Sequence, residues 1–169
     1  YSLKKKNKSF LSNSNLFKKK INTIYADINE IDKFSNKLKK FKPEIVIHLA
    51  SQPLVLESYK NTKKTFLTNV MGTVNFFESM KNLKSIKKII VFTSDKVYRN
   101  LSGNVLNENS PLGGVDPYSA SKSCQDIISS SYKSSIYNRN IEVIILRAGN
   151  IIGGGDWNEF RIVPDIYKS

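Results

Sequence analysis

Four short runs of apolar residues recur along the chain and predict the strands of a sheet. They lie at residues 21–26, 44–49, 89–92 and 142–146 and are rich in Ile and Val. The runs are largely unbroken and do not alternate with polar residues, which is typical of strands covered on both faces. The pattern therefore predicts a parallel sheet packed between helices.

Three stretches between these runs carry apolar residues at helical spacing. They span residues 30–41, 62–80 and 118–137, and their apolar stripes are Ile31, Phe34 and Leu38; Phe66, Val70, Val74 and Phe77; and Ala120, Cys124, Ile127, Ile128 and Ser131. Asp116-Pro117, directly before the third stretch, is a typical helix start. The alternation of strands and helices predicts an α/β fold, a doubly wound parallel sheet of the Rossmann-like type with right-handed crossovers.

Small and polar residues directly follow the predicted strands. They are Asp27, Ala50-Ser51-Gln52, Thr93-Ser94-Asp95-Lys96 and Arg147-Ala148-Gly149-Asn150. In such sheets, ligands bind beyond the carboxyl ends of the strands. The four clusters are therefore predicted to face one crevice. The connection over residues 95–117 has the length of functional loops.

The composition fits one globular domain and narrows the choice of partners. The 169 residues carry a net charge of +13, and residues 1–42 hold twelve Lys against three acidic side chains. Because these Lys are scattered and almost no Arg accompanies them, we interpret the charge as a solvated surface, with a basic nucleic-acid binder as the alternative. No apolar run is long enough to span a membrane, and no metal is expected. The single Cys124 excludes an internal disulfide and fits a reducing cytoplasm.

A Tyr and a Lys one helical turn apart give the strongest chemical signal. Tyr118 and Lys122 open the third predicted helix, downstream of the strand end Thr93-Ser94. A spacing of four residues brings both side chains to one helix face. An ammonium beside a phenol stabilises the phenolate, which can take a proton from a sugar hydroxyl while hydride leaves the same carbon. The pair predicts an enzyme working beside a nicotinamide, whereas His48, inside an apolar run, is interpreted as a packed strand-end residue.

Five motifs carry a resemblance to a known family. They are HLASQPLV at 48–55, TNVMGTV at 68–74, TSDKVY at 93–98, PLGGVDPYSASK at 111–122 and RAGNIIGGGDW at 147–157. With them the chain resembles the extended short-chain dehydrogenases/reductases of the NAD-dependent epimerase/dehydratase family, and within these the nucleotide-sugar 4,6-dehydratases, in particular their CDP-glucose branch. The resemblance runs along the whole chain and is loose over the first 20 residues.

The resemblance implies a catalytic set of Thr93, Asp95, Lys96, Tyr118 and Lys122. Thr93 would help to hold the sugar 4-hydroxyl, and Asp95 would protonate the departing 6-hydroxyl. Many related dehydratases carry Asp-Glu where this chain has Asp95-Lys96, and Asp-Lys is the pattern of the CDP-glucose branch. Lys96 could remove the C5 proton only if burial or a neighbouring cation lowered its pKa, so the identity of the C5 base stays open.

The resemblance also implies binding residues for NAD and for a nucleotide sugar. NAD would be held by Asp27, Ile28, Leu49, Ala50, Ser51 and Thr68, together with Tyr118 and Lys122. The substrate would contact Gln52, Thr93, Asn150 and Arg161, of which Arg161 is suited to a bidentate phosphate contact. Thr68 and Asn69 are poor helix formers inside a predicted helix, and a helix–helix hydrogen bond is the alternative role for Thr68.

The glycine fingerprint of dinucleotide-binding folds is missing, and the resemblance places it upstream of residue 1. Most of the substrate-binding lobe would follow residue 169. Residues 1–169 are therefore expected to form a partial NAD(P)-binding domain that lacks its first β-α-β unit, with residues 150–169 leading into that lobe. We expect that the first predicted strand does not pair natively with residues 44–49, and that this part alone binds NAD poorly.

The resulting hypothesis is an NAD-dependent lyase that converts CDP-glucose to its 4-keto-6-deoxy derivative through transient hydride transfer to NAD. The resemblance further implies a cytoplasmic homo-oligomer in deoxysugar and O-antigen biosynthesis, with no nucleic-acid or membrane partner. One alternative is a nucleotide-sugar epimerase or a GDP-mannose-type dehydratase; an epimerase has no need of Asp95 and Lys96 as an acid/base pair. Another is a non-catalytic binding module, against which the intact Tyr118 and Lys122 argue.

Overall fold

The computed structural model describes residues 24–99, 103, 105–137, 141–153, 156 and 162–168. The chain divides into two compact units, one over Ala26–Gly149 and a second that includes Asn150–Ser169. Within the second unit the described part forms one helix, α7 (Ile162–Lys168). All other described helices and strands belong to the first unit.

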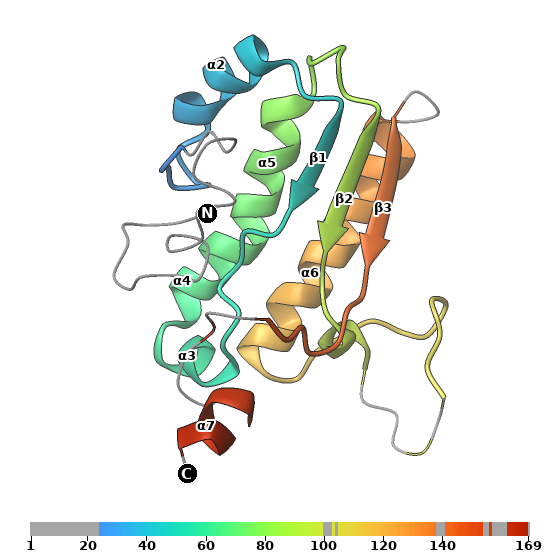
Figure 1. Ribbon diagram of the computed structural model, residues 1–169. Helices are drawn as coiled ribbons and strands as arrows, with labels where there is room; N and C mark the ends of the chain where they lie inside the picture. The colour runs from blue at the N-terminus through green and yellow to red at the C-terminus, as the bar shows by residue number, and fades with distance from the viewer. Residues whose placement is uncertain are drawn as a thin grey trace. The chain divides into compact units, whose positions relative to one another are not determined.

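A three-stranded parallel sheet lies at the centre of the first unit (Figure 1). Its order is β1 (Ile45–His48), β2 (Lys88–Phe92), β3 (Glu142–Leu146), with Ile45 opposite Lys88 and Lys88 opposite Glu142. Three of the four predicted strands are thereby confirmed. Residues 24–26 of the predicted first strand form no strand and do not pair with β1, and residues 21–23 lie outside the described residues.

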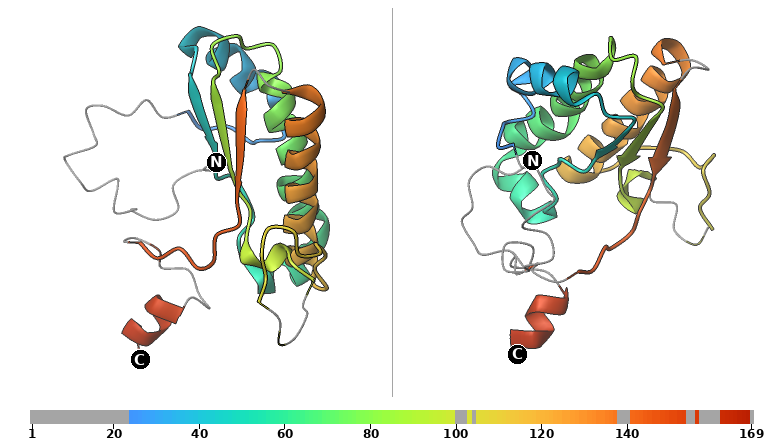
Figure 2. Two further views of the ribbon diagram at one scale, coloured as in Figure 1. Left: turned by 90° about the vertical axis from the view of Figure 1, so that its right-hand side faces the viewer. Right: turned by 45° about the horizontal axis from the view of Figure 1, so that its top comes forward.

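Helices cover one face of this sheet, as the edge-on view in Figure 2 shows for α5 (Gly72–Met80) and α6 (Pro117–Ser131). The path to α5 runs through α3 (Val55–Lys60), α4 (Thr62–Phe66) and the π-helix η1 (Leu67–Met71). A second π-helix, η3 (Tyr132–Ile136), continues α6, and α2 (Ile31–Phe41) packs against α5. The parallel, Rossmann-like α/β fold is confirmed, and the described helices of this unit form one of the two layers that double winding implies.

The apolar core lies between the sheet and these helices. Phe77, Met80, Ile89 and Val91 are fully buried there, and Tyr137 closes the cluster. The opposite face of β1 is exposed, with Ile45 at 60 % and Ile47 at 52 % of their full accessible surface. The core is therefore built by one face of the sheet and one helix layer.

The helix faces that are buried differ from the predicted apolar stripes. Along α4, η1 and α5 the buried positions are Thr65, Thr68, Asn69, Gly72, Thr73, Phe76, Phe77, Ser79 and Met80, so Phe77 alone of the predicted stripe is fully buried. On α6 the buried face consists of Ser119, Ser121, Lys122, Ser123, Gln125, Asp126 and Ser129, whereas Ile127 is 55 % exposed. Small polar side chains can occupy these faces because their hydrogen bonds are made inside the protein.

Candidate active site

The carboxyl end of β2 forms the centre of the candidate site. Beyond Phe92, the backbone stays tied to the segment after β3, because Thr93 donates to the Leu146 carbonyl (2.8 Å) and Asp95 to that of Ala148 (3.0 Å). A 3₁₀ turn, η2 (Asp95–Val97), follows, and the Ser94 hydroxyl caps it by accepting the Lys96 amide. This turn fixes the four polar residues after the strand, Thr93 to Lys96, in a defined arrangement.

Thr93 and Ser94 direct their hydroxyls to different partners. The Thr93 side chain is buried and lies 3.1 Å from an Asp126 carboxylate oxygen and 3.3 Å from the Leu146 carbonyl. Ser94, also buried, donates to Asp95 at 3.0 Å. A sugar contact by Thr93 stays a prediction. Ser94, which the sequence interpretation passed over, is the hydroxyl in direct contact with the predicted acid, and its place beside Thr93 in an extended segment was the available signal.

Asp95 and Lys96 form an ion pair on the surface of η2. Their charged atoms lie 3.8 Å apart, and the side chains are 51 % and 59 % exposed. The burial that would favour a neutral Lys96 is therefore absent. A role for Lys96 as the C5 base would need further structure over this turn, and both assignments stay predictions.

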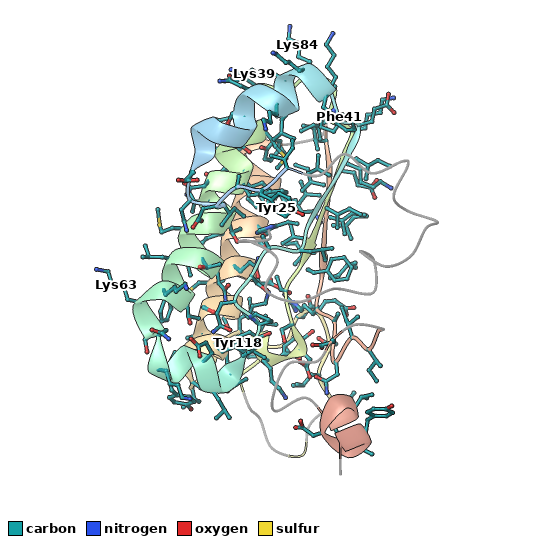
Figure 3. All side chains as sticks on the ribbon, turned by 60° about the vertical axis from the view of Figure 1, so that its left-hand side comes forward. Tyr25, Lys39, Phe41, Lys63, Lys84 and Tyr118 are labelled. Atoms are coloured by element: carbon teal, nitrogen blue, oxygen red, sulfur yellow. The ribbon has the colours of Figure 1, made fainter. Side chains whose placement is uncertain are left out.

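The first turn of α6 positions Tyr118. Asp116 caps the helix, since its carboxylate accepts the Ser119 amide at 3.0 Å and also the Ser119 hydroxyl, and Pro117 occupies the first helical position. The turn before the helix packs so closely against it that only a glycine fits at position 114. A Cβ on Gly114 would lie 2.2 Å from Cβ of Ser119. Tyr118 is half-buried at the lower end of the helix layer in the view of Figure 3.

Lys122 lies one turn further along α6 and is almost completely buried, with 2 % of its surface exposed. Its ammonium donates to the Phe92 carbonyl at 3.1 Å and to the Gln125 side-chain oxygen at 2.5 Å. Burial lowers the pKa of Lys122 from its ordinary value to about 8. The structure thus brings the predicted lysine directly under the end of β2, next to Thr93 and Ser94.

The segment after β1 is held by Asn69 from the π-helix η1. Asn69 accepts the Gln52 amide (2.7 Å) and donates both to the Gln52 carbonyl (3.2 Å) and to the Ser121 hydroxyl (2.9 Å). Ser121 in turn donates to the Tyr118 carbonyl at 2.7 Å. Asn69 therefore links the β1 loop to the turn that carries Tyr118. A π-helix inside a longer helix is frequent at functional sites, and the poor helix formers Thr68-Asn69 were its signal in the sequence.

The remaining residues after β1 differ in exposure. Leu49 is 64 % exposed, while Ala50 and Ser51 are half-buried. The Gln52 side chain bonds within its own turn and across to helix α4, through Leu54 and the Thr65 hydroxyl. Cofactor contacts by the first three and a substrate contact by Gln52 stay predictions.

An arginine–aspartate pair supports the site from the side of β3. Arg147 contacts both carboxylate oxygens of the fully buried Asp126, at 2.9 and 3.0 Å. The same guanidinium donates to the Tyr98 hydroxyl (3.2 Å) and to the Glu108 carbonyl (2.9 Å). The hydrogen bond to Asp126 raises the pKa of Arg147 further above its ordinary value. This pair ties the long connection before α6 to the end of β3.

His48, the histidine of β1, is a packed residue, as predicted. It is 2 % exposed, stacks on Phe76 at a centroid distance of 4.3 Å, and lies 3.0 Å from the Thr73 hydroxyl. Burial and, secondarily, the charge of Lys122 lower the pKa of His48 to about 3, so its ring is neutral near neutral pH.

The remaining predicted residues belong to other segments or fall outside the described residues. Asp27 accepts from the backbone and side chain of Asn29, and Ile28 is buried against Gly72. Thr68 is buried in η1. Asn150 is exposed and belongs to the second unit, and Arg161 lies outside the described residues.

In the part of the chain that the structure describes, His, Cys, Asp and Glu side chains form no group of three or more that could hold a metal ion. None of the described helices combines the length and the apolar character needed to cross a bilayer.

The parallel, Rossmann-like α/β sheet and the Tyr–Lys pair at the end of its central strand define the general class of the protein. Comparisons with known proteins identify the family within that class. The family model described as GDP-mannose 4,6 dehydratase matches residues 2–160. The chain belongs to this family of nucleotide-sugar dehydratases. The resemblance seen in the sequence is thereby confirmed.

Two relatives illustrate the similarity in sequence. A CDP-glucose 4,6-dehydratase from Salmonella typhimurium is 44 % identical over 151 residues, which cover 85 % of this chain and 42 % of the relative. A dTDP-D-glucose 4,6-dehydratase from Dictyostelium discoideum is 34 % identical, over 92 % of this chain and 38 % of the relative. The chain thus spans about two fifths of the length of these relatives.

Solved structures show the same fold. A dTDP-glucose 4,6-dehydratase from Streptomyces venezuelae with NAD bound superposes with a TM-score of 0.75 at 21 % identity, over 86 % of this chain and 43 % of that one. A UDP-N-acetylglucosamine 4-epimerase from Methanobrevibacter ruminantium gives 0.74 at 25 % identity, over 86 % and 46 %.

Proposed function

We propose that the protein, at its full length, is an NAD-dependent CDP-glucose 4,6-dehydratase. The observation that carries the proposal is the buried Lys122 ammonium, one turn after Tyr118 and bonded to the carbonyl at the end of β2. The 44 % identity to a CDP-glucose dehydratase supports the choice of sugar nucleotide.

The Lys122 ammonium fits a dinucleotide cofactor at this position. A lysine has three N–H donors, and the described residues supply two acceptors, Phe92 and Gln125. The donor left over can bind a hydroxyl of the cofactor or the Tyr118 oxygen. When bound, NAD would accept hydride from the sugar and return it. Asp27, Ile28, Leu49, Ala50, Ser51 and Thr68 are the further residues proposed to hold it.

Tyr118 and Lys122 would handle the first proton. The positive charge of Lys122 stabilises a phenolate at Tyr118, and the phenolate accepts the proton of the sugar 4-hydroxyl. Gln52, Thr93, Asn150 and Arg161 are proposed to orient the nucleotide sugar. Because two fixed acceptors hold the Lys122 ammonium, its charge stays in place throughout the reaction.

Asp95 would serve the loss of water from C5 and C6. Its carboxyl bonds to Ser94 and pairs with Lys96, and it is half exposed, so it can exchange its proton with solvent. Asp95 would protonate the departing 6-hydroxyl, and Lys96 is the candidate base at C5. We further propose that the enzyme is a cytoplasmic homo-oligomer that acts in deoxysugar biosynthesis for O-antigen.

The test is to incubate the full-length protein with CDP-glucose, dTDP-glucose and GDP-mannose in separate reactions with NAD. We expect a 4-keto-6-deoxy product from CDP-glucose, identified by mass spectrometry as the loss of one water. Tyr118→Phe should lower kcat by about two to four orders of magnitude, because the proton acceptor is removed. A fourth reaction with UDP-glucose serves as the contrast, because its conversion to the C4 epimer without loss of water would instead identify an epimerase.

A further inference from the structure

We propose that Gln125 is a positioning residue for Lys122, and that Thr73 and His48 fix the orientation in which the Gln125 amide serves it. The inference rests on the proposed function for its catalytic meaning, whereas the geometry belongs to the chain itself. Gln125 is 1 % exposed and lies three residues after Lys122 on the buried face of α6.

Gln125 supplies one of the two acceptors that hold the Lys122 ammonium. Its side-chain oxygen lies 2.5 Å from the lysine nitrogen, and the Phe92 carbonyl takes a second N–H. Both acceptors are neutral, so they fix the direction of the ammonium without cancelling its charge. That charge is what the proposed phenolate at Tyr118 requires.

Thr73 on α5 determines which way the Gln125 amide faces. The single proton of the Thr73 hydroxyl is donated to the Asn69 carbonyl at 2.7 Å. The Thr73 oxygen must therefore accept from the Gln125 nitrogen, 3.1 Å away. A flipped amide would set its NH₂ against the ammonium and its oxygen against an oxygen without a free proton. The arrangement allows one orientation, with the amide oxygen on Lys122.

His48 completes the chain from β1. Its Nε2 lies 3.0 Å from the same Thr73 oxygen, whose proton is already used, so Nε2 carries the hydrogen and donates. The stacked Phe76 ring holds the imidazole in place. Two donors on one oxygen prevent Thr73 from turning its proton towards Gln125, and the direction of every bond from His48 to Lys122 is then set.

The neutral side chains from His48 to Gln125 are the main support of the Lys122 ammonium, because the charged and titratable groups near it are neutral or paired with other residues. His48 on β1 is neutral near pH 7. Asp126, next to Gln125 on α6, is paired with Arg147. Asp95 on η2 pairs with Lys96 on the surface. Tyr118, on the same helix, is the proposed recipient of the Lys122 charge.

The test measures the Lys122 titration directly in the full-length protein. Lysines labelled with ¹³C at Cε are followed by NMR against pH, and the Lys122 signal is assigned as the one lost in Lys122→Met. Gln125→Met keeps the volume and removes the acceptor, so we expect the pKa of Lys122 to fall by about one unit. The alkaline limb of the kcat/KM profile for CDP-glucose should move down with it.

Matched variants separate positioning from packing. Ser129→Ala removes a buried hydrogen bond one turn further along the same face (2.7 Å, to the Gln125 backbone) and should leave the Lys122 titration unchanged. Thr73→Val should lower the pKa of Lys122, as Gln125→Met does. Thr73→Ser keeps the hydroxyl and should leave the pKa of Lys122 at its wild-type value. If Gln125→Met fails to fold, the two Thr73 variants decide the question.

An unshifted Lys122 titration in Gln125→Met or, if that variant fails to fold, in Thr73→Val would overturn the proposal and leave Gln125 a packing residue. Failure of the wild-type protein to convert CDP-glucose would instead defeat the proposed function, while the NMR titration would still decide the role of Gln125.

Discussion

At the scale of single residues, the site depends on buried polar side chains that find hydrogen-bond partners inside the protein. Lys122, Gln125 and Asp126 lie on the buried face of α6, and each is at most 2 % exposed. The Tyr118–Lys122 spacing was readable from the sequence because it follows from helix geometry. Gln125 and Asn69 were not, because their partners come from segments dozens of residues away and no local pattern encodes such contacts.

The Arg147–Asp126 pair gives a prediction for stability. Arg147→Met leaves the fully buried Asp126 carboxylate without its cation, so the free energy of unfolding should fall by about 3 to 5 kcal/mol. Chemical denaturation measures the change. Lys84→Met, at an exposed lysine labelled in Figure 3, is the matched loss of a cation and should change stability by less than about 0.5 kcal/mol. Equal effects of the two substitutions would contradict this account.

At the scale of elements, the sequence predicted the type and position of most helices and strands but not their buried faces. The strands at 44–49, 89–92 and 142–146 appear as β1, β2 and β3, because unbroken β-branched runs suit a covered parallel sheet. The predicted stripes were only partly right: Phe77 lies in the core and Ile128 packs against it, but most of the buried positions on these helices are serines, threonines and Asn69. Hydrophobic periodicity cannot detect a face that is buried through hydrogen bonds.

The turn before α6 gives a prediction at this scale. Gly114→Ala places a methyl group 2.2 Å from Cβ and 2.3 Å from the backbone carbon of Ser119, so the turn or the helix start must move. We expect a loss of about 1 to 3 kcal/mol in stability, together with a lower kcat because Tyr118 is displaced. Gly149→Ala, where a Cβ would meet nothing within 4 Å, is the control and should retain both. A fully active Gly114→Ala would show that the close contact does not position the tyrosine.

At the scale of the whole molecule, the described core is one sheet face and one helix layer, and the chain spans about two fifths of the length of its relatives. The sequence predicted the parallel α/β class and the family, both of which are confirmed. The sequence could not predict which contacts hold the segments after β1 and β2. Asn69 holds the first and Arg147 the second, and both come from distant parts of the chain.

The burial of His48, the single His of these 169 residues, makes a prediction for the pH dependence of stability. Folding lowers the pKa of His48 from an unfolded value of about 6.5 to about 3, so the unfolded state binds the extra proton between these values. The stabilisation that comes from neutral His48 is therefore fully present above about pH 6.5 and is lost as the pH falls. Between pH 6.5 and 5 the free energy of unfolding should decrease by about 2 kcal/mol.

Denaturation of the full-length protein at several pH values measures this loss. His48→Gln keeps a donor for Thr73 and cannot titrate at this position, so its unfolding free energy should fall by about 2 kcal/mol less than that of the wild type over the same interval. If the variant shows the same slope as the wild type, other groups cause the acid sensitivity.

The contacts of Asn69 have a consequence for how the site is assembled. One amide on η1 joins the segment after β1 to the start of α6, 17 and 52 residues away along the chain, so the three segments reach their final arrangement together. Because contacts between segments distant in sequence cost more loop-closure entropy, we expect this junction to close late in folding. Tyr118 therefore reaches its working position only in a molecule whose tertiary structure is already complete.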